Sequence, residues 1–162
     1  YNQQYGTNFI SVMPTNLYGP NDNFDLETSH VMPALIRKFH EAKVKNEPEV
    51  VIWGTGKPLR EFMHVDDMAD ACVHLMEKYN TDGIGEFVNI GVGKDITIGE
   101  LSEVIKEIVG FEGTVRKDLS KPDGTPQKLL DITKLSSLGW KAKISLRDGI
   151  EQTYEWYQSQ IK

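Results

Sequence analysis

The densest run of ionisable residues in the chain is Arg60–Asp67, which reads Arg-Glu-Phe-Met-His-Val-Asp-Asp. The planar guanidinium of Arg60 could contact two oxygens of a diphosphate at once, whereas the alternative is an ion pair with Glu61 or Asp66. Trp53 stands directly before a glycine-containing loop, where its ring could face a sugar or a base. The alternative for Trp53 is an ordinary core tryptophan, and the residues alone leave both questions open.

His30 is the histidine whose position best suits proton transfer, because it follows a polar stretch and precedes an expected helix. The positive end of a helix dipole disfavours an imidazolium, so a neutral, proton-exchanging imidazole is a candidate there. The four histidines do not have metal-ligand spacing, and the single cysteine, Cys72, excludes a multi-cysteine site. We therefore expect no metal, and we interpret Cys72 as a buried structural residue.

The charge of the chain is unevenly distributed. The net charge is −6 over 162 residues, which argues against a general nucleic-acid-binding protein. Residues 61–112 hold 12 acidic and 3 basic residues, so an anionic ligand is expected on residues 37–60 and 116–134 instead. No run of 18 apolar residues occurs, so no membrane span is expected, and the cysteine usage favours a reducing, cytoplasmic setting.

Hydrophobic periodicity and turn residues predict strands that alternate with helices, and hence an α/β fold. The expected strands are residues 9–13, 49–53, 61–65, 87–90 and 128–132, and residues 14–25 are expected to be rich in turns. The expected helices are a helix end at residues 1–5 closed by Gly6, followed by residues 30–45, 66–79, 97–109, 133–139 and 145–157.

Three of these helices carry explicit start signals in the sequence. Asp66 is expected to cap a helix whose apolar stripe includes Met68, Ala71, Cys72, Leu75, Met76 and Tyr79. Thr97 with Glu100, and Ser145 with Asp148, have the spacing of capping boxes.

Dinucleotide-binding and catalytic signatures are missing from the sequence. Glycine pairs occur at 54/56, 83/85 and 91/93, but none has the third glycine of Gly-x-Gly-x-x-Gly. No tyrosine is followed four residues later by lysine. We interpret the glycine pairs as ordinary turns.

Taken together, several strings in the chain resemble the extended short-chain dehydrogenase/reductase family. The strings that carry the resemblance cover nearly the whole chain in order: Ser11–Pro20 with Asp22–Phe24, Ser29–His40, Trp53–Gly56, Arg60–Ala69 and Lys121–Asp131. The resemblance implies the C-terminal part of an NAD(P)-binding, Rossmann-like enzyme, mainly its smaller substrate-binding domain. Within the family, it implies NADPH-dependent 3,5-epimerisation and 4-keto reduction of GDP-4-keto-6-deoxy-D-mannose.

The resemblance also assigns roles to residues of this chain. It implies that the backbone of Pro14, Thr15, Asn16 and Leu17 lies against the nicotinamide end of NADP(H). It implies that His30 contacts the cofactor region and gives or takes a proton during epimerisation. Contacts to the GDP-sugar substrate are implied for Lys38, Trp53, Arg60, Asp123 and Lys128. Lys38 stands where relatives can carry arginine, and the lysine keeps the positive charge but lacks the bidentate fork of a guanidinium.

The family's glycine fingerprint and Ser…Tyr-x-x-x-Lys set have no counterpart here, so we expect a C-terminal fragment that is inactive alone. Residues 1–20 would be the last part of the cofactor-binding domain, and residues 21–162 the substrate-binding domain with elements returning to the Rossmann sheet. The full-length protein would be a homodimer. Two alternatives remain: a fragment of a UDP- or dTDP-sugar epimerase or dehydratase, and a non-catalytic nucleotide-sugar-binding module.

Overall fold

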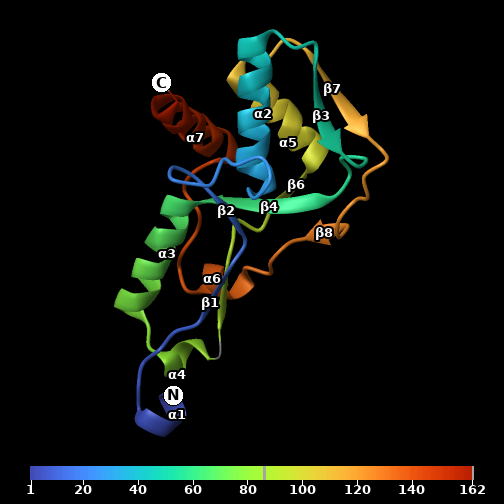
Figure 1. The fold of residues 1–162 in the computed structure, drawn as a ribbon. Coiled ribbons are helices and arrows are strands. Elements are labelled where there is room, and N and C mark those ends of the chain that lie inside the picture. Colours follow the sequence, from blue (N-terminus) through green and yellow to red (C-terminus); the bar gives the residue numbers. More distant parts are fainter. Residues whose placement is uncertain (86, 162) are drawn as a thin grey trace.

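Strands alternate with helices along most of the computed structural model, which describes residues 1–85 and 87–161 (Figure 1). The helices are α1 (Asn2–Tyr5), α2 (Val31–Lys45), α3 (Val65–Lys78), α4 (Thr81–Ile84), α5 (Ile98–Val109), α6 (Thr133–Ser137) and α7 (Leu146–Gln160). The strands are β1 (Val12–Pro14), β2 (Asn16–Tyr18), β3 (Glu49–Trp53), β4 (Leu59–His64), β5 (Val88–Ile90), β6 (Asp95–Thr97), β7 (Thr114–Asp118) and β8 (Gln127–Lys128).

The strands form three small sheets. β1 pairs with β5, β3 pairs with β7, and β4 lies between β2 and β6 while also pairing with β8. Within the described residues, the β4–β6 pair is antiparallel and the other pairs are parallel. Parallel pairing with intervening helices confirms the predicted α/β class.

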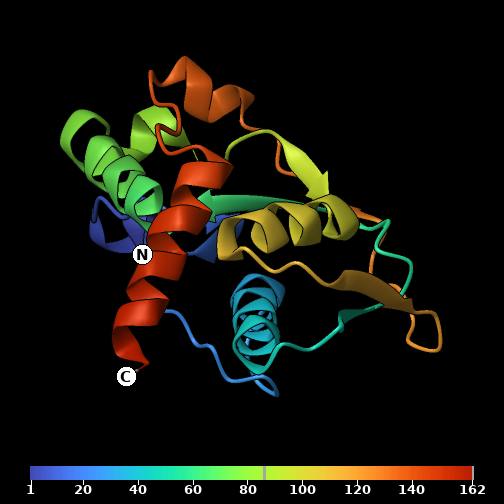
Figure 2. The same ribbon diagram turned by 90° about the horizontal axis from the view of Figure 1, so that it is seen from above.

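Two hydrophobic cores lie on opposite sides of β4 (Figure 1). The upper core consists of buried residues from α2, α5, α7 and the strands beside them: Tyr18, Met32, Leu35, Ile36, Phe39, Ala42, Val50, Ile52, Phe62, Leu101, Ile105, Val109, Phe111, Ile150, Tyr154 and Tyr157. Seen from above, α2, α5 and α7 lie side by side around it (Figure 2).

The lower core joins α3, α4 and α6 to the β1–β5 pair. Its buried residues are Met63, Ala71, Leu75, Ile84, Val88, Ile90, Leu135 and Trp140. After Ala142 the chain leaves this core and returns to the upper one through α7. β4 contributes to both cores, with Phe62 in the upper one and Met63 in the lower one, because successive side chains of a strand point to opposite faces.

Several predicted elements are confirmed with little change. α2 and β3 occur where they were expected, and α1 ends at Gly6 in the left-handed conformation. α5 begins with the predicted Thr97–Glu100 capping box, in which both reciprocal hydrogen bonds are present, and it ends at Gly110.

The segment around Pro14 differs from its prediction. The strand expected at residues 9–13 begins at Val12, because its partner β5 is three residues long and the register runs from Val12 opposite Val88 to Pro14 opposite Ile90. The expected turn-rich stretch contains strand β2, so only Thr15 separates β1 from β2. Pairing with the neighbouring strands overrides the local preference of this proline- and asparagine-rich sequence for turns.

Other predictions of elements were wrong. The cap of α3 is His64 and not Asp66, because β4 runs straight into the helix and the His64 Nδ1 atom accepts the Asp66 backbone N–H at 3.3 Å. The strand expected at residues 128–132 is only β8. The sequence reading also missed α4, β6 and β7, of which the two strands are held by long-range pairing to β4 and β3.

Candidate functional site

A cleft of about 380 Å³ opens between α2, the end of β3 and the loop before β8. Much of its lining is apolar, including Leu26, Val31, Ala34, Leu35, Ile52, Trp53, Pro58, Ile98 and Pro122. Polar side chains at the cleft come from Glu27, Ser29, Lys38, Arg60 and Asp123. An apolar cavity with a few polar groups is the usual form of a small-molecule site. The cleft also joins the two segments on which the charge distribution placed an anionic ligand.

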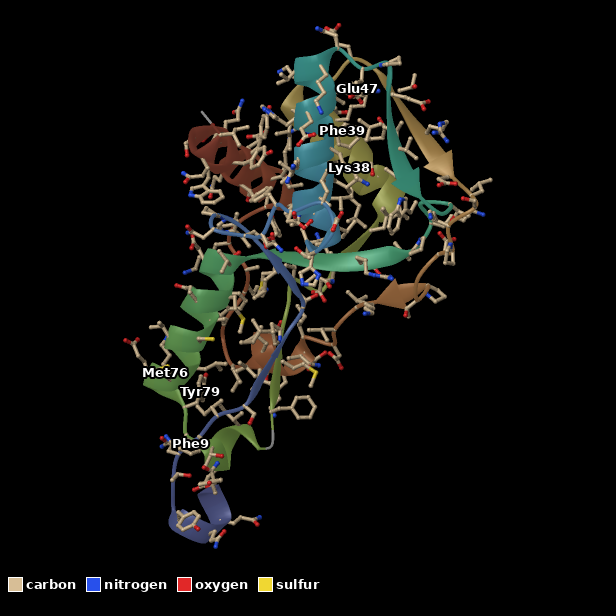
Figure 3. All side chains as sticks on the ribbon, in the orientation of Figure 1. Phe9, Lys38, Phe39, Glu47, Met76 and Tyr79 are labelled. Atoms are coloured by element: carbon tan, nitrogen blue, oxygen red, sulfur yellow. The ribbon has the colours of Figure 1, made fainter. Side chains whose placement is uncertain are left out.

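Trp53 stands at the end of β3 with 67% of its surface exposed, so the core-tryptophan alternative is wrong. The Lys38 Nζ atom lies 5.7 Å from the centre of its ring, and the Lys121 Nζ atom lies 5.5 Å from it. Figure 3 shows Lys38 leaving α2 on the side of β3. Burial lowers the pKa of Lys38, because an ammonium group is disfavoured away from water. The cleft therefore has an aromatic face with two cationic groups beside it.

Arg60 projects from β4 into the cleft. Its Nη1 atom donates to the carbonyl oxygens of Leu59 and Thr125, both at 2.7 Å. Within the described part of the chain, no carboxylate forms an ion pair with Arg60, so the alternative of pairing with Glu61 or Asp66 is wrong. The two carbonyls fix the plane of the guanidinium, and its remaining N–H groups are suited to an anion.

Asp123 lines the cleft, but both of its carboxylate oxygens have partners in the protein. Thr55 donates its backbone N–H to Oδ1 at 2.8 Å and its hydroxyl to Oδ2 at 2.6 Å. These hydrogen bonds, that of the hydroxyl first, hold the pKa of Asp123 below its usual value. A side chain at Gly54, where φ is +72°, would overlap the same carboxylate. Asp123 thus fastens the loop before β8 to the end of β3.

The other predicted contact residues lie outside the cleft lining. His30 is the N-terminal residue flanking α2, and its exposed ring makes no capping hydrogen bond. Its neighbours Ser29 and Val31 both line the cleft, so His30 lies at the cleft's edge. Lys128 is exposed on β8, directly opposite Arg60 in the parallel register, and is not a lining residue.

Four of the five predicted cofactor-contacting residues, Pro14 to Leu17, lie where β1 passes into β2. Thr15 donates its backbone N–H to the Ile90 carbonyl oxygen at 3.0 Å. The Thr15 hydroxyl and the Asn16 side-chain amide both donate to the carbonyl oxygen of Glu61, at 3.2 and 2.7 Å. β1 and β2 each pair along one edge within the described residues. The other edge therefore carries backbone N–H and C=O groups that have no strand partner among these residues.

Sequence reasoning missed one residue of the cleft lining, Ser29, and one residue beside the Trp53 ring, Lys121. The Ser29 hydroxyl oxygen is buried without a hydrogen-bond partner among the described residues, although the residue itself lines the cleft. Lys121 belongs to one of the motif strings, but nothing in the sequence indicates that it meets Trp53, which lies 68 positions away.

Elsewhere in the molecule, Cys72 is only half-buried beside the lower core, and burial raises the pKa of its thiol. Across residues 1–85 and 87–161, no group of three His, Cys, Asp or Glu side chains is placed to hold a metal ion. None of the helices in the same residues has the length and apolarity needed to cross a membrane.

Comparison with known proteins finds relatives that match nearly the whole chain. The chain is 62% identical to GDP-L-fucose synthase 1 of Arabidopsis thaliana, over 99% of the chain and 49% of that protein. It is 55% identical to GDP-L-fucose synthase of Escherichia coli K12, over 97% of the chain and 51% of that protein. Among solved structures, GDP-mannoheptose C4 reductase of Campylobacter jejuni with NADP bound matches with a TM-score of 0.84 and 40% identity, over 98% of the chain and 55% of that structure.

The chain thus spans about half the length of the curated relatives it matches. The sequence model of the NAD dependent epimerase/dehydratase family matches residues 1–91, more than half of the chain. The matching region contains β1, β2, β4 and the cleft residues Lys38, Trp53 and Arg60. On this evidence the chain belongs to the NAD dependent epimerase/dehydratase family.

Proposed function

We propose that this chain is the nucleotide-sugar-binding part of an NADPH-dependent enzyme that converts GDP-4-keto-6-deoxy-D-mannose to GDP-L-fucose by 3,5-epimerisation and 4-keto reduction. The observation that carries the proposal is the meeting of Lys38, Trp53 and Arg60 at one largely apolar cleft. The names of the relatives support the choice of GDP as nucleotide and of NADP(H) as cofactor.

The cleft residues divide the task of binding. The Arg60 guanidinium, held in plane by two carbonyl oxygens, would take two oxygens of the diphosphate, and Lys38 would add a second positive charge. The exposed ring of Trp53 would cover a base or sugar. Asp123 would act indirectly, by holding the loop that closes the cleft, because Thr55 already occupies its oxygens.

His30 would give or take the proton during epimerisation. A 4-keto group acidifies the hydrogens at C3 and C5, so a base and an acid on either side of the sugar can invert both centres. The imidazole at the start of α2 is exposed beside the cleft, where a sugar attached to the diphosphate can reach it. NADPH, when bound, supplies the hydride for reduction at C4, and the backbone of Pro14–Leu17 would orient its nicotinamide.

We propose further that residues 1–162 alone have no turnover, because the sequence contains neither Gly-x-Gly-x-x-Gly nor Tyr-x-x-x-Lys. The lower core would lie on the cofactor side of the enzyme and the upper core on the substrate side. We assign the complete enzyme to the cytoplasm as a homodimer. Size-exclusion chromatography with light scattering tests the dimer, and a single protomer mass for the active enzyme would contradict it.

Calorimetric titration of the folded chain with GDP and then UDP tests the choice of nucleotide. We expect GDP to bind more tightly, and Arg60→Ala to weaken GDP binding by roughly tenfold or more through loss of charge-assisted hydrogen bonds. Arg116→Ala is the matched control, because Arg116 pairs with Glu49 on the surface and does not line the cleft. Tighter binding of UDP would favour a UDP-sugar enzyme. Turnover by the chain without added protein would contradict the separate proposal that residues 1–162 are inactive alone.

A further inference from the structure

Glu61 is a fully buried acidic residue at the junction of the two cores, and the proposed reaction does not use it. Its carboxylate accepts three backbone N–H groups: Val92 and Gly93 donate to Oε1, both at 2.6 Å, and Leu130 donates to Oε2 at 3.0 Å. A carboxylate is a pure acceptor, so three donors match it fully. A Cβ atom at Gly91 would overlap the Oε1 atom, so the turn after β5 is shaped to admit this side chain.

The backbone of the same residue holds the segment that connects β1 to β2. The Glu61 carbonyl oxygen accepts the Thr15 hydroxyl at 3.2 Å and the Asn16 side-chain amide at 2.7 Å. Thr15 is also tied by its backbone N–H to Ile90, the residue just before the turn that the carboxylate holds. One residue therefore holds the Thr15–Asn16 segment directly and also through the end of β5.

Burial makes this arrangement costly to lose. An acidic group that is 0% exposed has no water to replace its partners, so removing an acceptor leaves backbone N–H groups unsatisfied. Arg60, the preceding residue, lies at the cleft, whereas the Glu61 side chain meets the turn after β5. Arg60 of β4 thus faces the proposed nucleotide side, and the next residue, Glu61, faces the proposed nicotinamide side.

We propose that Glu61 is a positioning residue that fixes the Pro14–Leu17 segment for the nicotinamide while leaving the nucleotide cleft unaffected. The proposal rests on the proposed function for the identity of the cofactor. Glu61 acts through Thr15, Asn16 and the turn at residues 91–93, and it does not touch the reacting atoms.

The variant Glu61→Gln tests the proposal, because its amide group places a donor against the backbone N–H groups that the carboxylate accepts. Asp67→Asn is the matched control: Asp67 is also buried, and its carboxylate accepts the N–H groups of Lys143 and Ile144 instead. Amide hydrogen exchange of the whole chain reports on each segment, and calorimetry with GDP reports on the cleft.

In Glu61→Gln we expect the amides of Thr15, Asn16, Val92 and Gly93 to exchange roughly tenfold faster or more, with GDP affinity within about twofold of wild type. Asp67→Asn should accelerate exchange at residues 143–144 and leave Thr15 and Asn16 unchanged. Unchanged exchange at Thr15 and Asn16 in Glu61→Gln would overturn the proposal. An equal loss of GDP affinity would also overturn it, since it would indicate a general structural role.

Two further measurements complete the test. If Glu61→Gln does not fold, Asn16→Ala is the second variant, because Asn16 is exposed and donates to the Glu61 carbonyl oxygen. It should accelerate amide exchange at Thr15 and Leu17 alone. Saturation-transfer NMR of the complete enzyme with NADP⁺ should show contact with the nicotinamide protons in wild type and in Asp67→Asn, and a weaker contact in Glu61→Gln. Absence of that contact in wild type would contradict the proposed cofactor site, while hydrogen exchange would still decide the role of Glu61.

Discussion

α2 in the upper core and α3 in the lower core have almost the same length, 15 and 14 residues, but they are buried very differently. α2 buries Met32, Pro33, Leu35, Ile36, Phe39 and Ala42, whereas α3 buries only Asp67, Ala71 and Leu75. α2 packs against α5 and β3, while α3 contacts mainly β2 and β4 (Figures 1 and 2).

The difference shows that burial depends on how many layers cover a helix, and not on its apolar stripe alone. Met76 belongs to the predicted stripe of α3, yet it is 74% exposed at the far end of the helix (Figure 3). That part of the prediction was wrong. Cys72 and Tyr79 of the same stripe are half-buried, because the described part of the chain covers α3 along one narrow face.

The largest expected effect comes from truncating a buried side chain in each core. Phe39→Ala in α2 should lower the free energy of unfolding by about 3–5 kcal/mol, through lost burial and the cavity that remains. Leu75→Ala in α3 should cost about 2–3 kcal/mol, because the more open lower core can relax around the gap. Urea denaturation followed by circular dichroism measures both values. A larger loss for Leu75→Ala would contradict the ranking of the two cores.

The junction between the cores should be sensitive to a single methyl group. Gly91→Ala forces a Cβ atom against the buried Glu61 carboxylate and should cost about 1–3 kcal/mol by overpacking. Gly83→Ala in α4 is the matched control, since its Cβ atom would meet no atom within 4 Å. We expect the control to change stability by at most about 1 kcal/mol, and in the stabilising direction. Equal melting temperatures for the two variants would show that the residues around Gly91 accommodate the added methyl group at little cost in stability.

The loss of a partly buried hydrogen bond should distinguish the stability of the two cores next. The Trp140 indole Nε1–H donates to the Asp70 carboxylate at 2.7 Å at the edge of the lower core, so Trp140→Phe should cost roughly 1–3 kcal/mol. Trp156→Phe is the control at the edge of the upper core, where the indole stacks on Phe24. We expect Trp156→Phe to lower the stability less than Trp140→Phe, as measured by thermal unfolding. A larger loss at Trp156 would reverse the comparison.

The smallest change in stability is expected at the loop before β8, because this loop is exposed. The pKa of Asp123 is lowered by Thr55, so the two hydrogen bonds are complete at neutral pH and are lost only as the pH falls through that lowered pKa. Hydrogen exchange of the Thr55 amide should accelerate over that acidic range, with little change in global stability. Asp123→Asn should abolish the pH dependence, and a transition that persists in the variant would assign it to another group.

The parts of the protein that can be predicted from the sequence are those whose signals are local. The capping box at Thr97, the glycine stop at Gly110 and the helix at residues 31–45 follow from neighbouring residues, because caps and periodicity act within a turn or two. The uneven charge also indicated both segments that meet at the cleft. Arg60 and Trp53 are predicted from their residue types and positions, whereas Lys38 and Asp123 are predicted only from the family resemblance.

Which groups in these segments remain free to bind a ligand depends on contacts made in the folded chain. Asp123 accepts hydrogen bonds from Thr55, and Glu61 accepts backbone N–H groups instead of pairing with Arg60. Lys121 lies beside the ring of Trp53. Each of these contacts joins residues more than 30 positions apart, so no local pattern encodes it. β2, β6 and β7 escaped prediction for the same reason: a short strand is stabilised by its partner, and the partner is supplied by the fold.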